Sequence, residues 1–108
     1  MSDTENPWSD ETEYLSHLRV ERHMFAWALE RYGDLPSSAA ASAAETFYAY
    51  EPPSRYRGLL FHDDAWHWAM LHLHGDNYWM SNPGLETPPV QFEDEWRRIS
   101  DAADSRQT

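Results

Sequence analysis

The sequence predicts a small all-α protein, a single-domain bundle of about four helices around an aromatic-rich core. Three observations support this prediction. Apolar residues recur at helical spacing in several segments, and residues that begin or end helices stand at the edges of those segments. Phe, Trp and Tyr make up 15% of the chain, so a few large rings can fill much of a modest core. A length of 108 residues is enough for one domain.

The first helix is expected over residues 10–32, after a flexible acidic tail at 1–8. Asp10 and Glu13 have the spacing of a capping box, in which each side chain satisfies a backbone N–H group. Gly33 stands where a glycine commonly ends a helix. The apolar stripe of this helix consists of Leu15, Leu18, Phe25, Leu29 and Tyr32.

A second helix is expected over residues 38–50, because alanine has the highest helix propensity and this segment is rich in it. The two prolines at 52–53 prevent the helix from continuing. The apolar run at 58–61 is too isolated to form a sheet, and we expect it to be a short extended, buried connection.

Within the stretch 61–76, FHDDAWHWAMLHLHGD, a third helix is expected up to about His74, and a strand is the alternative because Trp68, Met70 and His72 alternate with Ala69, Leu71 and Leu73. Asp63 or Asp64 can cap its start, and Gly75 can end it. Trp66 and Met70 then lie on the face that packs into the core. A short helical turn is expected over 77–81.

The last main helix is expected after Thr87, with the following two prolines in its first turn. Its apolar stripe consists of Phe92, Trp96, Ile99 and Ala103. The helical domain is expected to span residues 9–104, with a frayed tail at 105–108.

The outstanding bulk property is the charge, since 19 acidic residues face eight basic ones and the formal net charge is −11. Nucleic acids and anionic membranes repel such a chain, whereas basic protein surfaces attract it. The absence of cysteine excludes disulfides and thiolate chemistry. The first residues do not resemble a signal peptide, and we expect a cytoplasmic protein.

One alternative is a metal-dependent or acid–base enzyme, or a ligand binder, built on His62, Asp63, His67, His72 and His74. The histidines stand five, five and two residues apart, so on a helix the five-residue steps put ligands on different faces, while His67 and His74 share a face but lie two turns apart. Among these five residues, Asp63 and His67 have the i, i+4 spacing of an oriented acid–base pair. No nucleophile or phosphate-binding motif is present. We therefore expect a protein without a cofactor and without catalytic activity.

The favoured function is a small acidic binding protein that occupies a basic surface, in particular that of a nucleic-acid-binding protein, and inhibits or regulates it. In size, charge and lack of catalytic motifs the chain is similar in style to phage-encoded anti-restriction and anti-CRISPR proteins. A third alternative is an accessory subunit of a larger assembly, and a homodimer is compatible with the sequence. The carboxylates expected to meet the partner are Asp3, Glu5, Asp10, Glu11, Glu13, Asp63, Asp64, Asp76, Glu93, Asp94 and Glu95. The aromatic anchors expected beside them are Trp8, Trp68 and Trp79.

Overall fold

The computed structural model describes residues 11–53 and 57–107, and within these ranges the chain forms helices and connecting turns without any strand. The predicted all-α class is therefore confirmed. The main helices are α2 (Glu11–Gly33), α3 (Ser37–Phe47), α4 (Ala65–His74) and α6 (Val90–Gln107). Shorter elements are η1 (Leu59–His62), α5 (Tyr78–Ser81) and η2 (Pro83–Leu85). Among the described helices, none has the length and apolar content required to cross a bilayer.

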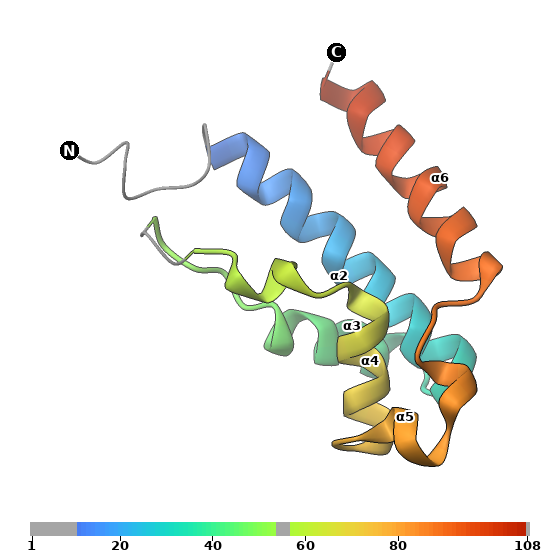
Figure 1. The fold of residues 1–108 in the computed structure, drawn as a ribbon. Helices are drawn as coiled ribbons and strands as arrows, with labels where there is room; N and C mark the ends of the chain where they lie inside the picture. The colour runs from blue at the N-terminus through green and yellow to red at the C-terminus, as the bar shows by residue number, and fades with distance from the viewer. Residues whose placement is uncertain (1–10, 54–56, 108) are drawn as a thin grey trace.

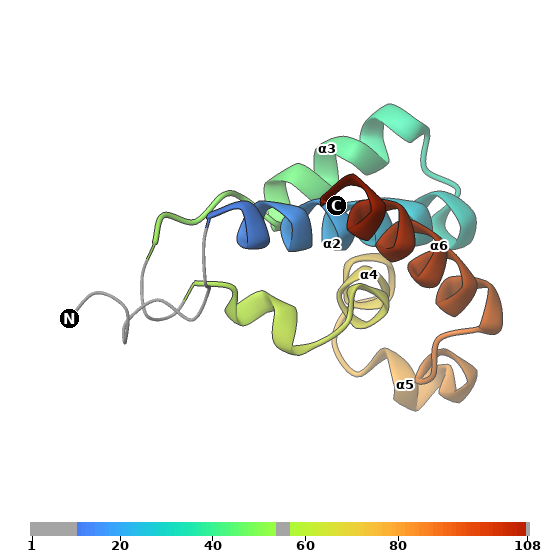
Figure 2. The same ribbon diagram turned by 90° about the horizontal axis from the view of Figure 1, so that it is seen from above.

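Helix α2 is the centre of the fold and packs against α3, α4 and α6 (Figure 1). In the view of Figure 2, α3 lies above α2 and α4 lies below it. Because α2 has neighbours on several sides, buried residues occupy most of its length; they include Tyr14, Leu18, Met24, Phe25, Ala28 and Leu29. The predicted stripe was wrong at its two ends, since Leu15 is 41% exposed and Tyr32 is 39% exposed.

The end of α2 differs from the prediction in one detail. The helix continues through Gly33, and Asp34 takes the left-handed conformation with a φ of 58°. A Cβ atom on residue 33 would lie 2.4 Å from Cδ2 of Leu73. The glycine thus allows the end of α2 to approach α4 closely.

Helix α3 is shorter than expected and ends at Phe47, where Tyr48 leaves the helix and is buried. Ala40 and Ala44 are its buried residues, and their small side chains let the helix lie close to α2. The expected extended connection at 58–61 was wrong. Gly58, at a φ of 84°, precedes the 3-10 helix η1, because a left-handed residue turns the chain into a tight helical turn.

Helix α4 begins and ends as predicted. The side chain of Asp64 accepts a hydrogen bond from the backbone N–H of His67 at 2.9 Å, and Gly75 forms the C-cap. Trp66 and Met70 are buried, as the helical spacing predicted. The indole N–H of Trp66 donates to the carbonyl of Leu85 at 2.7 Å, which fixes the loop before α6.

Helix α6 begins after the two prolines instead of including them. The carbonyl of Pro89 accepts from the backbone N–H of Phe92 at 3.0 Å and starts the helix. Phe92 is buried, and its ring lies 5.6 Å from that of Trp66. The helix continues to Gln107 and therefore includes most of the segment expected to be a frayed tail.

Candidate functional site

The histidines of the 61–76 stretch do not converge. Nδ1 of His67 lies 3.0 Å from the hydroxyl of Tyr78, the His72 ring meets the edge of Phe25, and His74 is exposed at the end of α4. The side chain of His62 lies outside the described part of the structure. Among the side chains that are described, no three His, Cys, Asp or Glu lie together in a way that could hold a metal ion.

Two further histidines pair with carboxylates of their own. Nε2 of His17 lies 3.2 Å from buried Glu21, and Nε2 of His23 lies 2.5 Å from Glu95. These contacts tie each ring to a neighbour in the fold. Because the pairs are separate, the arrangement does not assemble an acid–base group around a common centre.

Glu11, one of the carboxylates expected to meet a partner, has two partners within the chain itself. Oε1 of Glu11 accepts from Nη2 of Arg57 at 2.7 Å, and Oε2 accepts from the hydroxyl of Tyr50 at 2.6 Å. These contacts, that of Tyr50 first, hold the pKa of Glu11 below its ordinary value. The partner lies 46 residues away, so no local pattern could reveal the pair. The predicted contact residues Asp3, Glu5, Trp8 and Asp10 lie outside the described residues.

Arg57 is the buried half of this pair. Its side chain is 0% exposed, and its guanidinium carbon lies 3.6 Å from the ring centroid of Tyr14. The ring of Tyr50 lies 5.5 Å from the same carbon. An arginine thus sits between a carboxylate and aromatic faces, which combines an ion pair with cation–π contact. We call Glu11, Tyr14, Tyr50 and Arg57 the tyrosine–arginine cluster.

Two acids of α6 form ion pairs with arginines of the same helix. Asp94 pairs with Arg97 at 3.1 Å, and Glu95 pairs with Arg98 at 2.6 Å. Both are i, i+3 pairs on the surface of one helix.

Glu95 is not the outward-facing acid that the sequence predicted. Its side chain is 14% exposed because it turns toward His23 on α2. The hydrogen bond from Arg98, with a further contribution from His23, lowers the pKa of Glu95 to about 2.

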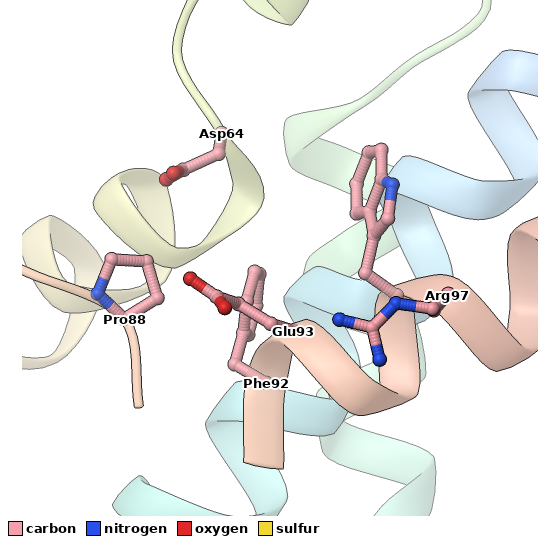
Figure 3. Close-up of a pocket in the computed structure, with 6 residues that line it drawn as sticks. Asp64, Pro88, Phe92, Glu93 and Arg97 are labelled. Carbon is pink, nitrogen blue, oxygen red and sulfur yellow. The ribbon is translucent and has the colours of Figure 1, made fainter. Parts of the chain in front are cut away.

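A pocket of about 380 Å³ lies where the start of α4 faces the start of α6. Figure 3 shows Asp64 on the α4 side, Pro88 in the loop, and Phe92, Glu93 and Arg97 on α6. Trp96 completes the lining. The pocket therefore combines apolar walls with two carboxylates that come from different elements.

Further carboxylates surround the same end of the molecule. The pKa of Tyr78 is raised, first by burial of its hydroxyl and then by the negative charges of Asp64, Glu86 and Asp63. Three carboxylates therefore act on one phenol, and one of them, Asp64, also lines the pocket with Glu93. We call Asp63, Asp64, Glu86 and Glu93 the acidic end. All of its members are exposed.

No arginine of the described chain pairs with any carboxylate of the acidic end. Sequence reasoning found Asp63, Asp64 and Glu93 but missed Glu86. The position of Glu86 depends on the loop that the hydrogen bond from Trp66 to Leu85 fixes, and no spacing pattern reveals that contact. Of the other predicted acids, Glu13 and Asp76 are exposed.

The predicted aromatic anchors Trp68 and Trp79 differ in their exposure and in their internal contacts. Trp68 was expected at the surface, but it is half-buried. Its indole N–H donates to the carbonyl of Leu60 at 2.8 Å, and its ring lies 5.4 Å from Phe47, so internal contacts occupy it. Trp79 is 36% exposed, and the next residue, Met80, is 72% exposed. Trp79 therefore remains a candidate anchor.

In comparisons with protein-family models, curated proteins and solved structures, the chain shows no significant match.

Proposed function

We propose that this protein is a non-catalytic binding protein that docks its acidic end on a basic protein surface and inhibits or regulates that partner by occupancy. The observation that supports this most is the unequal neutralisation of charge. Glu11, Asp94 and Glu95 have arginine partners, whereas the described chain provides none for the acidic end. Exposed carboxylates that the fold does not neutralise attract a basic surface from solution.

The partner class follows from the electrostatics. Surfaces that bind nucleic acids carry many arginines and lysines, because they neutralise phosphates. A protein with a formal net charge of −11 competes for such a surface and does not bind the nucleic acid itself. Occupancy is the mode of inhibition used by the phage-encoded proteins to which the chain is similar in style. The proposed setting is the cytoplasm, with which a chain lacking cysteine is compatible.

Trp79 and Met80 give this proposal an apolar component. Large exposed side chains of these types are frequent at protein interfaces, where tryptophan often contributes much of the binding energy. Steering by charge sets the rate of association, and burial of such side chains sets how slowly the complex dissociates.

The test is co-purification with the immobilised full chain from the native host at about 50 mM and about 500 mM salt. We expect a basic partner that is retained at the lower concentration and lost at the higher one, because salt screens exposed charges. The triple variant Asp63→Asn, Glu86→Gln, Glu93→Gln should lose the partner. A matched triple variant carries the same change of charge elsewhere, at Asp34→Asn, Glu45→Gln and Asp101→Asn, and should keep it.

Two outcomes contradict the proposal. A partner whose retention does not change with salt would favour an accessory subunit held by apolar contacts. Equal loss in both triple variants would show that total charge matters and that the acidic end has no special role.

A further inference from the structure

We propose that the pocket between α4 and α6 binds the side chain of an arginine from the basic partner. The guanidinium would lie between the carboxylates of Asp64 and Glu93, against the ring of Trp96. This inference rests on the proposed function and specifies which group of the partner the acidic end recognises.

The lining of the pocket has the chemistry that a long cationic side chain requires. Phe92, Trp96 and Pro88 provide apolar surface for the methylene stem. Asp64 and Glu93 provide negative charge from two different elements, so a cation between them interacts with both (Figure 3). A volume of about 380 Å³ lies within the range of sites that enclose small ligands, about 300–1,000 Å³.

The carboxylates retain capacity for a ligand. Oδ1 of Asp64 accepts the capping hydrogen bond from His67, and no hydrogen bond from the described residues reaches Oδ2. The side-chain carboxylate of Glu93 makes no hydrogen bond or ion pair within the described chain. Arg97 also lines the pocket, but the carboxylate that it contacts is Asp94, at 3.1 Å.

The same molecule shows how an arginine fits such surroundings. In the tyrosine–arginine cluster, Arg57 pairs with Glu11 while its guanidinium lies 3.6 Å from the centroid of the Tyr14 ring. The pocket offers carboxylates from two elements and an aromatic wall, and the arginine of its own lining, Arg97, pairs with Asp94, which does not line the pocket. A partner's arginine would complete there the arrangement that the chain completes internally with Arg57.

Arginine fits better than lysine for a geometric reason. A guanidinium is planar, stacks on an aromatic face and presents several N–H donors in a fixed fork, whereas an ammonium is a compact and strongly hydrated charge. The carboxylates of Asp64 and Glu93, which come from different elements, can accept hydrogen bonds from different N–H groups of the guanidinium. The preference for arginine therefore distinguishes this pocket from a general attraction to positive charge.

The test is a titration of the ¹⁵N-labelled full chain, followed by NMR, with three probes. These are the N-acetyl amides of arginine, lysine and citrulline, the last being a neutral isostere of arginine. We expect the arginine probe to shift the indole N–H signal of Trp96 with a dissociation constant in the millimolar range, as suits so small a ligand. The lysine probe should bind about threefold or more weakly, and the citrulline probe should not bind measurably.

Variants locate the binding. Glu93→Gln and Asp64→Asn should each weaken the arginine probe about three- to fivefold, because each removes one of two charges at the guanidinium. Asparagine still caps α4, so Asp64→Asn keeps the helix start. Glu45→Gln changes the net charge equally from an exposed position on α3 and should leave the affinity within about twofold.

The results separate this inference from the proposed function. Equal binding of arginine and lysine, binding of citrulline, or signals that shift away from the pocket would overturn the inference. So would a salt-sensitive partner that Glu93→Gln weakens no more than Glu45→Gln, and the proposed function would then remain. If the arginine probe binds specifically but co-purification recovers no basic partner, the inference about the pocket would hold and the proposed function would be overturned.

Discussion

The tyrosine–arginine cluster and the pocket use the same kinds of side chain in opposite ways. In the cluster, Glu11 is paired with an arginine that is 0% exposed and that packs against Tyr14. In the pocket, Asp64 and Glu93 stand beside aromatic residues, and no arginine of the described chain pairs with them. One set of charges joins α2 to the chain that precedes η1, and the other faces solvent.

This difference indicates which charges stabilise the fold and which do not. An arginine that pairs with a carboxylate and packs its guanidinium on an aromatic ring contributes to stability. Carboxylates that lie close together without a cation repel one another and contribute little. Removing charge should therefore weaken the fold at the cluster and leave it nearly unchanged at the pocket.

The largest effect is expected for Arg57→Ala. The substitution removes the ion pair with Glu11, the contact with the Tyr14 ring and the packing of a fully buried side chain. We expect the free energy of unfolding to fall by about 2–3 kcal/mol, less than for a fully buried pair because Glu11 is 45% exposed and can be hydrated. Urea denaturation followed by tryptophan fluorescence measures the change.

The control is Arg57→Lys, which keeps the charge but loses the planar fork. It should recover only part of the stability, since lysine does not stack on Tyr14 in the same way. Full recovery would show that charge alone holds the cluster together, and the comparison with the aromatic pocket would lose its basis.

The second largest effect on stability is expected for Glu95. It lies on the same helix as Glu93 but, unlike Glu93, it pairs with Arg98 and His23. Its folded-state pKa is about 2, below the ordinary value of 4.5. The stability that it contributes is therefore present above about pH 4.5 and is lost as the pH falls toward 2. Solvent screens the exposed Arg98 and keeps the contribution smaller than that of Arg57.

Acid titration of unfolding in the wild type and in Glu95→Gln measures this contribution. The stability difference between the two proteins should shrink from pH 5 to pH 2. A Glu93→Gln control should show no comparable shrinkage, because Glu93 has no partner among the described residues. A constant difference between wild type and Glu95→Gln would contradict the role of Glu95 as an anchor between α6 and α2.

Local patterns predicted the fold well because helices depend on local chemistry. The Asp64 cap, the Gly75 end and the burial of Trp66 and Met70 all follow from spacings of a few residues. The segment around Gly58 failed because a short apolar run suits an extended segment and a 3-10 turn equally.

The site was predicted less well, because pairing is a long-range property. Glu11 meets Arg57 across 46 residues, and Trp68 reaches the carbonyl of Leu60 only after η1 has turned the chain. Composition showed that acids exceed bases, but it could not show which acids pair with the arginines. Glu11 and Glu95 each pair with an arginine, whereas Glu93 pairs with none in the described chain.

The smallest effect on stability is expected for the double variant Asp64→Asn, Glu93→Gln. The two carboxylates lie near the starts of α4 and α6, where negative charge is favourable, but they share this end of the molecule with Asp63 and Glu86 and repel them. The two effects oppose each other, so the free energy of unfolding should stay within about 1 kcal/mol of the wild type. Urea denaturation of the double variant, the wild type and Arg57→Ala under the same conditions measures the difference. A loss as large as that of Arg57→Ala would mean that the pocket carboxylates hold the fold together, and that their exposure does not mark a binding surface.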